Sequence, residues 1–386
     1  MKRAIKVRLY PTVEQAEFLN AQFGAVRCVF NKALHISCHM YQRHGVSLNP
    51  KRDLKPLLAK AKKSRRYHWL KDYDSQALQQ SVINLDRAFQ NFFQKRAKFP
   101  RFKSKHGKQS SYHPNGKILT DAIQLPKMTP IKAVIHREII GKVSSITMTR
   151  SATGKYYAAI LCDDGQEVPA KPCLITDITG LDMGLSHFVI KSTGEKIANP
   201  RFLNRHSRNL RRKQKALSRK KKGSANRAKA RLQVARCHEH VANARADFQH
   251  KLSRTLIDEN QAIIVETLKT ANMMKNHRLA RAIGDAGWHS FISRLEYKAE
   301  QKGVYVVKLD QWYASSRRCH CCGGKMSEMP LHKRRWQCPE CAVEHDRDIN
   351  AAINIRQKGI VELQTAGHVV SAHGGLRKSV APTVAA

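Results

Sequence analysis

Apolar positions near the start of the chain pass from an alternating to a helical spacing. Basic and apolar side chains alternate over residues 1–10, which is the period of a β-strand. Thr12 and Gln15 then have the spacing of a capping box, and apolar residues recur every three or four positions as far as Ala33. A second helix is predicted from Asp74 onward. Its apolar face comprises Leu78, Val82, Leu85, Phe89 and Phe92.

Residues 106–175 are rich in turn residues and contain short runs in which apolar and polar side chains alternate. Residues 145–149 and 155–161 are the clearest of these runs, and each has the pattern of a half-buried strand. Together with the first strand, they predict a small β-barrel formed by residues 1–10 and 106–173. The helical segment 11–105 would interrupt this barrel as a separate module.

Strands alternate with helices from residue 174 onward. This pattern predicts a further core built from residues 174–311 and 345–361. Its last helix is predicted to begin at Asp348 and to stop at Gly359, and residues 362–386, which show no periodicity, are predicted to be a disordered tail. The other elements are a strand ending near Asp182, strands over residues 187–191, 261–266 and 303–310, and a helix over residues 288–301.

Positive charge dominates the segment from Arg205 to Arg231, which holds thirteen lysine or arginine residues and no acid. Its periodicity predicts a long basic helical hairpin over residues 203–258, with Gly223 and Ser224 at the tip. A charged run is usually only a solvated face, but a run of one sign repels itself and is better matched by a phosphate backbone. The candidate nucleic-acid contacts here are Arg211, Arg212, Lys213, Lys220, Lys221 and Lys222.

The whole chain also has a large excess of positive charge. Its 386 residues include 71 lysines and arginines against 29 aspartates and glutamates, which gives a net charge of +42 and a pI near 10.3. Nucleic acid is the expected partner of so basic a chain. A membrane surface is the alternative, but no apolar run approaches about 18 residues and no signal peptide opens the chain. We therefore expect a cytoplasmic, nucleoid-associated prokaryotic protein with reduced thiols.

Two CxxC pairs in the segment 312–344 have the spacing of a zinc knuckle. Each tight turn presents two sulfurs to one tetrahedral ion, and residues 326–337 between the pairs are predicted to form a hairpin that carries the second turn. A glycine, Gly323, suits the first turn. A disulfide or idle thiols are the alternative, which nothing else in the chain favours. The predicted ligands of one structural Zn²⁺ are Cys319, Cys322, Cys338 and Cys341, with Cys321 and His320 as neighbouring donors able to substitute.

Three carboxylates stand at the ends of predicted elements. Asp182 follows a strand, Glu266 terminates an otherwise apolar strand, and Asp348 opens the last helix. Burial of such acids is costly unless a cation compensates, and Mg²⁺ takes oxygen ligands. Two Mg²⁺ ions about 4 Å apart can activate water and stabilise the leaving oxygen in phosphodiester cleavage. The order of strand with hairpin, then strand, then helix is that of an RNase-H-like nuclease core.

Each acid also has a structural interpretation. Asp348 fits a helix N-cap, Asp182 a turn, and Glu266 an ion pair with a nearby base. The three together, in this order and beside the knuckle, favour the catalytic interpretation. Asp346 and Asp310 are expected near the same site, with Asp346 in a supporting role.

These features together resemble the TnpB family, the OrfB-type proteins of insertion sequences that are similar to compact relatives of type V CRISPR effectors. The resemblance covers nearly the whole chain and implies an RNA-guided DNA endonuclease with one RuvC-like site. By motif position, Asp182, Glu266 and Asp348 correspond to the family's catalytic acids. The matching motifs are residues 6–11, 99–105, 180–184, 285–288 and 295–299, the two CxxC pairs and residues 345–355.

The resemblance also implies the partners. These are a guide RNA from the end of the protein's own element and a double-stranded DNA target beside a short motif, with Mg²⁺ for cleavage and no obligate protein partner. The barrel and the helical module correspond to the family's wedge and recognition lobes, and Gln79 to a position facing the target-adjacent motif. Ala314 replaces a usual proline, and the region up to Lys51 differs from typical members, so the motif itself stays open.

Two other functions are compatible with these features. A transposase would perform strand transfer with the same core, and a nuclease-independent guided regulator would bind RNA and DNA without cutting. The basic hairpin has no evident use in a transposase, and the intact acids argue against a regulator. The expected fold class is α+β and multidomain, with a RuvC-like core, an inserted zinc knuckle, and an N-terminal β-barrel interrupted by the helical module.

Overall fold

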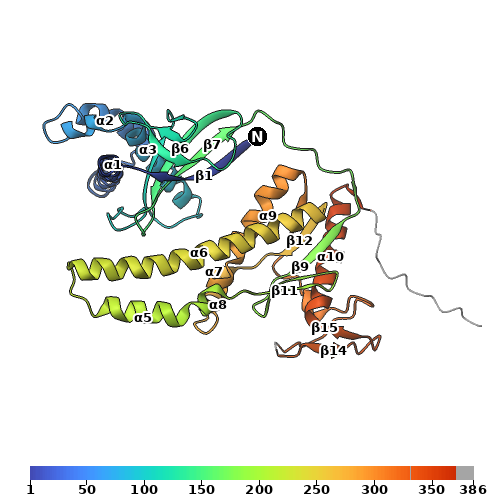
Figure 1. Ribbon diagram of the computed structural model, residues 1–386. Coiled ribbons are helices and arrows are strands. Elements are labelled where there is room, and N and C mark those ends of the chain that lie inside the picture. The colour runs from blue at the N-terminus through green and yellow to red at the C-terminus, as the bar shows by residue number, and fades with distance from the viewer. Residues whose placement is uncertain (331, 371–386) are drawn as a thin grey trace, which may run out of the picture. The chain divides into compact units, whose positions relative to one another are not determined.

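The computed structural model describes residues 1–330 and 332–370, and Figure 1 shows the course of the chain. The chain divides into two compact units, the first formed by Met1–Glu167 and the second by the residues from Val168 onward. This division falls close to the boundary predicted after residue 173. In the described part of the chain, no helix is both long and apolar enough to cross a membrane.

The first unit contains one antiparallel sheet in the order β2-β6-β7-β1-β5-β4-β3. Alternate residues of β7 are buried, because successive side chains of a strand point to opposite faces. Strands β2 and β3 end the order and no pairing joins them in the described residues, so the predicted barrel is not a continuous closed ladder. The strands are β1 (Lys2–Tyr10), β2 (Gln109–His113), β3 (Lys117–Ile118), β4 (Ala122–Gln124), β5 (Ile131–Val134), β6 (Lys142–Arg150) and β7 (Tyr156–Asp163).

Two long helices of the first unit begin where the sequence predicts. Helix α1 (Val13–His44) has the predicted capping box, in which Thr12 and Gln15 each accept a hydrogen bond from the other's backbone N–H. Helix α3 (Ser75–Phe93) has Asp74 as its N-cap. Their apolar faces pack into one core cluster. Between them lie η1 (Pro50–Leu54), α2 (Lys55–Ala61) and η2 (His68–Asp72).

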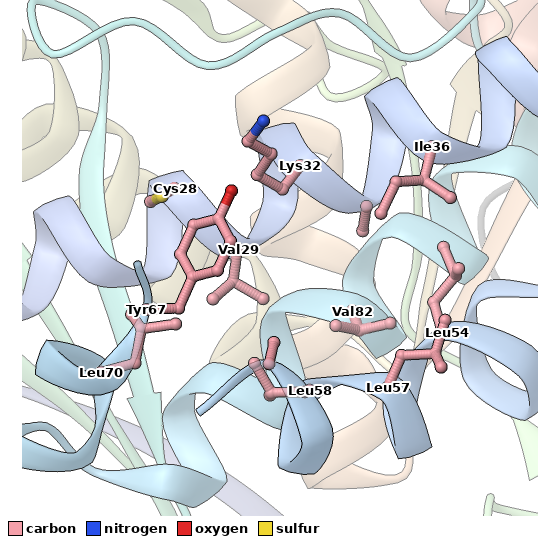
Figure 2. Close-up of a pocket in the computed structure, with 12 residues that line it drawn as sticks. Cys28, Val29, Lys32, Ile36, Leu54, Leu57, Leu58, Tyr67, Leu70 and Val82 are labelled. Carbon is pink, nitrogen blue, oxygen red and sulfur yellow. The ribbon is translucent and has the colours of Figure 1, made fainter. Parts of the chain in front are cut away.

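A pocket of about 110 Å³ lies among these helices (Figure 2). Its walls are mainly aliphatic side chains such as Leu54, Leu58 and Val82, with Lys32 and Tyr67 as its main polar members. Small-molecule sites usually add several convergent polar groups to an apolar wall. This pocket therefore belongs to the packing of the module rather than to a candidate site.

A buried chain of hydrogen bonds joins α3 to the sheet. His113 Nδ1 lies 2.7 Å from Asp74 Oδ2, and Ser111 Oγ lies 2.8 Å from His113 Nε2. The connectivity is that of a nucleophilic triad, but Ser111 is only 2% exposed, so a substrate could not reach its hydroxyl. Asp74 also accepts from Gln76 N at the start of α3. The chain of bonds therefore fixes the start of this helix against strand β2.

The second unit contains a mixed sheet in the order β11-β10-β9-β12-β13. Strands β9, β10 and β11 pair antiparallel, whereas β12 pairs in parallel with both β9 and β13. Parallel neighbours place their carboxyl ends at the same edge of the sheet. The bounds are β9 (Ile178–Asp182), β10 (His187–Lys191), β11 (Lys196–Ala198), β12 (Ala262–Glu266) and β13 (Tyr305–Leu309).

Helices cover both faces of this sheet (Figure 1). Helices α6 (Ala225–Glu259) and α9 (Trp288–Lys302) share one apolar cluster with Ile263 of β12. Helix α10 (Arg347–Thr365) shares the opposite cluster with the next residue, Ile264. Because neighbouring residues of β12 face opposite sides, the whole strand is apolar until Glu266.

The prediction that the last helix stops at Gly359 was wrong, because α10 continues to Thr365. A Cβ atom on Gly359 would lie 2.4–2.6 Å from side-chain atoms of Ile264. The glycine therefore lets the helix approach the sheet and does not end it. Gly180 serves the same purpose on β9, where a Cβ would lie 2.2 Å from Ala352 O.

The predicted disordered tail also begins too early in the sequence. Leu363 is buried in the cluster beneath α10, and β16 (Val369–Val370) pairs in parallel with β8 (Leu174–Ile175). The prediction of disorder was wrong for residues 362–370, since apolar contacts and strand pairing hold them. Residues 371–386 lie outside the described residues.

The predicted basic hairpin consists of α5 (Ser207–Ser218) packed along α6. At its tip, Gly223 has φ +88° and Ser224 caps α6 by accepting from Arg227 N, so both predicted tip residues are at the turn. The remaining elements of the unit are α4 (Phe202–Arg205), α7 (Thr270–Met273), α8 (Ala280–Ala286), η3 (Ser315–Arg317), β14 (Arg335–Gln337) and β15 (Glu344–Asp346).

Candidate active site and metal centre

Asp182 and Glu266 end two neighbouring parallel strands. The register of β9 and β12 pairs Leu181 with Val265, and each acid is the next residue of its strand. The two carboxylates therefore emerge at the same edge of the sheet. The sheet topology thus brings together two acids that are 84 positions apart in the sequence.

Asp348 reaches the same site from helix α10. It is the second residue of the helix, and the N-cap is Asp346, whose Oδ1 accepts from Asp348 N and Ile349 N at 3.1 Å each. Asp346 also pairs with Lys196. The structure thus gives the capping role to Asp346 and not to Asp348. Asp310 is engaged locally, since it accepts from the backbone of a residue two positions later.

Burial and mutual repulsion change the ionisation of this cluster. Burial, reinforced by the nearby charges of Glu266 and Asp348, raises the pKa of Asp182 to about 8. Burial also raises the pKa of Glu266, although a hydrogen bond from the Ser315 hydroxyl opposes the shift. A carboxyl whose pKa is raised by burial and by neighbouring negative charge is one to which a cation would bind favourably.

Arg334 belongs to the same cluster and was not predicted. Its Nη1 lies 3.0 and 3.2 Å from the two carboxylate oxygens of Asp348, and its carbonyl accepts from Arg347 N at 2.8 Å. Because Arg334 comes from the cysteine-rich segment, this ion pair ties that segment to the start of α10. Arg334 could not be singled out from the sequence, since it stands between two other basic residues, Lys333 and Arg335.

The three acids do not form one compact donor set. Among the described residues, the groups of three or more donors lying within 4.8 Å of one another consist of cysteine and histidine, and none contains these carboxylates. Asp348 is paired with Arg334, and Glu266 accepts a hydrogen bond from the Ser315 hydroxyl. Carboxylate oxygens remain the donors that Mg²⁺ prefers, and a pair of ions needs a wider arrangement than one ion does.

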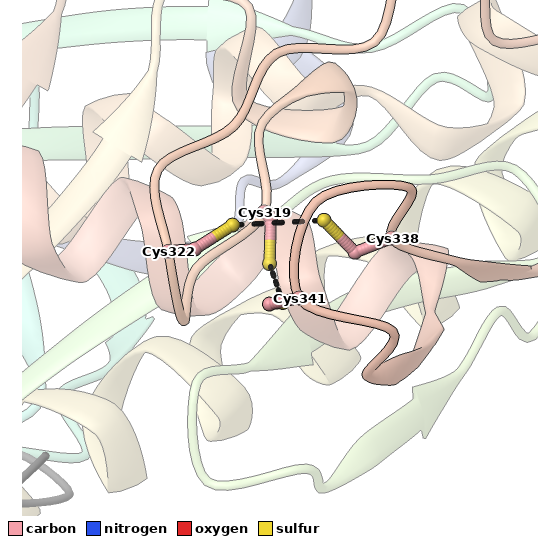
Figure 3. Close-up of side chains that lie close together, drawn as sticks. All are labelled: Cys319, Cys322, Cys338 and Cys341. Carbon is pink, nitrogen blue, oxygen red and sulfur yellow. Dashed lines mark hydrogen bonds between the residues drawn. The ribbon is translucent and has the colours of Figure 1, made fainter.

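The four predicted cysteines converge on one point (Figure 3). Their sulfurs all lie within 4.8 Å of one another, and the pairs Cys319–Cys341 and Cys322–Cys338 are separated by 3.6 Å. Zinc–sulfur bonds of about 2.3 Å in a tetrahedron require sulfurs roughly 3.8 Å apart. The donor set therefore fits a metal ion such as zinc.

Two matching turns present these cysteines. Gly323 N donates to Cys319 O and Ala342 N donates to Cys338 O, each at 2.9 Å. Gly323 has φ +84° and Ala342 has φ +56°, so each turn places a left-handed residue after its second cysteine. The turn role predicted for Gly323 is confirmed. The predicted hairpin over residues 326–337 was misplaced, because the paired strands are β14 and β15, which flank the second turn.

His320 and Cys321, the predicted substitutes, lie outside the four-sulfur set. His320 N and Nδ1 each lie 3.0 Å from Asn350 Oδ1, so this residue attaches the knuckle to α10. A second group combines Cys319 and Cys321 with His345, whose Nε2 is 3.0 Å from Cys319 Sγ. Sequence reasoning missed His345 because no second histidine at ligand spacing accompanies it. Of the two groups found in the described residues, the four-cysteine group supplies all four donors of a tetrahedral shell.

The predicted nucleic-acid contacts lie mostly on exposed surface. Arg211 and Arg212 on α5 and Lys220–Lys222 at the tip are exposed, whereas Lys213 is half-buried. Within the described chain, none of them pairs with an acid, and the ion pairs of the hairpin lie further along α6. Gln79 is half-buried on α3 of the first unit. The free basic surface expected from the charge run is therefore present on the hairpin.

Three family models match separate parts of the chain. One described as "Probable transposase" matches residues 165–277, one described as "Cas12f1-like, TNB domain" matches residues 288–355, and one described as "Helix-turn-helix domain" matches residues 1–46. The first two matches together include all three acids and all four cysteines. Residues 1–46 here form strand β1 and helix α1 instead of a pair of helices.

Relatives are similar over almost the whole chain. A protein of Streptomyces pristinaespiralis named "Putative RNA-guided DNA endonuclease" is 38% identical over 368 residues, which cover 93% of this chain and 90% of that protein. A protein of Escherichia coli (strain K12), "Putative RNA-guided DNA endonuclease InsQ", is 32% identical over 402 residues, which cover 99% and 97%. Among solved structures, a chain of the "Cas12f1-sgRNA-target DNA complex" matches with 13% identity and a TM-score of 0.38, over 93% of this chain and 100% of that one. So low a score does not identify a common fold.

Proposed function

Because the chain belongs to the TnpB family of OrfB-type proteins, we propose that it is an RNA-guided, Mg²⁺-dependent endonuclease that cuts double-stranded DNA beside a short motif. The cutting site is single and RuvC-like. One observation carries the proposal: Asp182 and Glu266 meet at the ends of adjacent parallel strands, with Asp348 at the start of the covering helix. The names of the full-length relatives support the guide RNA and the DNA target.

Asp182, Glu266 and Asp348 hold the catalytic Mg²⁺ ions in this proposal. Bound Mg²⁺ supplies an activated water and a counter-charge for the leaving oxygen of the phosphodiester. The Ser315 hydroxyl orients Glu266 through a hydrogen bond, and the Arg334 guanidinium orients Asp348. Arg334 also places positive charge beside the acids, where a phosphate group would bring further negative charge.

The four cysteines hold one Zn²⁺ in a structural role. Protein thiolates would fill all four positions, which leaves none open for water or substrate. The zinc instead supports the segment that carries Arg334, and so acts on the acids indirectly, through contacts such as the Arg334–Asp348 ion pair.

The guide RNA, transcribed from the end of the protein's own element, supplies sequence specificity by pairing with one DNA strand. The unpaired basic side chains of the hairpin bind phosphate backbone, and Gln79 contributes to reading the adjacent motif. No obligate protein partner is required. With DNA as the target, the nucleoid is the proposed place of action.

The test is a cleavage assay on protein purified with its co-expressed native RNA. The complex is incubated with Mg²⁺ and a plasmid that carries the guide-matched target behind a randomised flank. We expect linear product that depends on RNA and Mg²⁺, is lost in Asp182→Ala, and is retained in Asp177→Ala. Asp177 is the matched control because it is an exposed acid just before β9, at the other end of the strand from Asp182.

The outcomes separate the functions compatible with the family. Loss of cutting in Asp182→Ala with unchanged RNA binding supports the nuclease. Bound RNA without cutting by the wild-type protein would favour a guided regulator. RNA-independent cutting with joining of an element end to target DNA would favour a transposase.

A further inference from the structure

A polar pocket of about 310 Å³ lies in the second unit and contains none of the three acids or four cysteines of the proposed function. Three separate segments line it: the loop after β9, the segment that leads into and includes α4, and the region of α8. Three of its residues are the exposed arginines Arg201, Arg278 and Arg281, and Asn199 and Asn204 add side-chain amides. The pocket therefore combines groups that donate hydrogen bonds and carry positive charge.

The charge of this pocket is not compensated from within. In the described residues, none of the three arginines forms an ion pair with an acid, and the single acid of the wall is Asp285. Asp285 is 7% exposed, accepts from Leu203 N at 2.9 and 3.0 Å through its two oxygens, and pairs with Arg245 at 3.0 Å. Its charge is thus already engaged, which leaves the guanidinium groups without a counter-ion.

Arg201 adopts a backbone conformation that is unfavourable for a residue with a Cβ atom. Its φ of 48° and ψ of 50° lie in the left-handed region. Arg201 N donates to Asn199 Oδ1 at 3.2 Å, and Asn199 Nδ2 donates to Leu185 O at 3.0 Å, so the surrounding loop holds this conformation. Strain of this kind persists where neighbouring contacts enforce it, and it is concentrated at binding sites.

We infer that this pocket binds a phosphodiester group of the DNA strand that is being cut, a few nucleotides from the scissile bond. The inference rests on the proposed function. Planar guanidinium groups match phosphate oxygens and bind them through paired hydrogen bonds, which accounts for three arginines without an acidic partner around one cavity.

The position of the pocket along the chain sets the distance from the cut. Leu185, which lines the pocket, is three residues after Asp182, so their Cα atoms are at most roughly 11 Å apart. A DNA strand rises about 3.4 Å per nucleotide along the duplex axis. The bound phosphate is therefore expected within about three or four nucleotides of the scissile one.

Single-turnover cutting of chemically modified DNA tests this inference. The complex of protein and co-purified RNA is given guide-matched targets in which one phosphate at a time, along the cut strand, is replaced by a neutral methylphosphonate. We expect one position near the cut, other than the scissile phosphate, to slow the wild-type complex by about tenfold or more. In the double variant Arg278→Gln, Arg281→Gln, cutting of unmodified DNA is slowed to a similar degree, and the same methylphosphonate adds no further effect.

Lys275→Gln is the matched control, because Lys275 is an exposed cation of the same segment that does not line the pocket. It should keep both the wild-type rate and the sensitive position. A double variant that folds, as judged by an unchanged melting temperature, and still shows that sensitive position would overturn the inference. A double variant that binds the RNA more weakly in the absence of DNA would also overturn it, since the phosphate would then belong to the guide.

Failure of the inference is distinguishable from failure of the proposed function. If the wild-type complex does not cut unmodified target, both are rejected. If it cuts and the double variant cuts at the same rate, only the pocket assignment is rejected.

Discussion

The Asp182 carboxyl destabilises the folded protein when no divalent cation is bound. Its pKa of about 8 lies above the value of roughly 3.9 in an unfolded chain, so the folded state binds more protons between these pH values. Stability therefore falls as the pH rises from about 4 to about 8, and this contribution changes no further above that range.

We predict that Asp182→Asn stabilises the protein in buffer without added Mg²⁺. The gain should be small near pH 4 and should grow to the order of a few kcal/mol near pH 8, because a neutral amide avoids the cost of the buried charge. Thermal unfolding at several pH values measures it. Asp177→Asn, at an exposed position, should show no such trend. A gain of equal size at pH 5 and pH 8 would contradict this account.

The structural positions of some single residues could be predicted from the sequence, and those of others could not. The positions of Asp182 and Glu266 at strand ends were predictable because each interrupts a local apolar pattern at its end. The contact of Arg334 with Asp348 was not predictable, since it depends on the knuckle folding back onto α10. In the sequence, Arg334 does not stand out from the basic residues on either side of it. The caps at Thr12 and Asp74 were predictable because a cap depends only on the next few residues.

At the scale of elements, we expect the four-cysteine knuckle to influence the proposed active site from outside it. The β14–β15 hairpin is short, and its cluster of buried residues includes Cys319 and Cys338. Structural zinc commonly supplies most of the folding free energy of so small an element. Without the metal, this segment would no longer hold Arg334 against Asp348.

We predict that Cys322→Ser lowers the zinc content, the melting temperature and the cutting rate together, with the rate falling about tenfold or more. Cys321→Ser is the adjacent control and should keep one zinc per chain, because Cys321 lies outside the four-sulfur set. Metal analysis and thermal unfolding of both variants provide the measurement. Zinc loss in Cys321→Ser instead would assign the ion to the group with His345.

Glycine positions test the packing of α10 on the sheet. Gly359→Ala should destabilise the protein by about 1–3 kcal/mol, because the added Cβ would meet Ile264 side-chain atoms at 2.4–2.6 Å. Gly284→Ala in α8 is the control, since nothing lies within 4 Å of its Cβ position. It should stabilise slightly, by about 0.5–1 kcal/mol, through helix propensity. Urea unfolding measures both, and equal effects of the two substitutions would contradict the packing argument.

The same helix shows where element prediction fails. A glycine ahead of a stretch without helical periodicity is a reasonable local stop signal. The close packing of Gly359 in α10 against Ile264 in β12 nevertheless decides the outcome. Strand β16 is likewise held by pairing with β8, almost 200 positions earlier. Such long-range contacts leave no local periodicity to read.

At the scale of the whole molecule, the net charge of +42 indicates a polyanionic partner but not where it binds. The hairpin could be located because its basic residues are consecutive in sequence. The arginine pocket could not, because its lining residues come from segments near positions 185, 200 and 280 that meet only in the folded unit. The fold of the core was therefore more predictable than its surface.

The hairpin tip offers a quantitative test of how that charge is used. Binding of a protein to nucleic acid weakens with salt in proportion to the number of phosphates neutralised, with a slope of about 0.7 to 0.9 per contact. If Lys220, Lys221 and Lys222 each contact a phosphate, replacing all three with glutamine should reduce the slope of log K against log salt concentration by about 2 to 3. Titration of the RNA with the protein at several KCl concentrations gives this slope.

A control variant separates local contacts from total charge. Lys251→Gln removes a cation of α6 that is already paired with Asp247, so the salt slope should change by well under 1. The tip variant should also bind more weakly at low salt and approach the wild-type affinity at high salt, because the lost term is electrostatic. If the tip variant loses affinity equally at all salt concentrations, the lysines act through the fold of the hairpin. An unchanged slope and affinity would place the RNA on another surface of the chain.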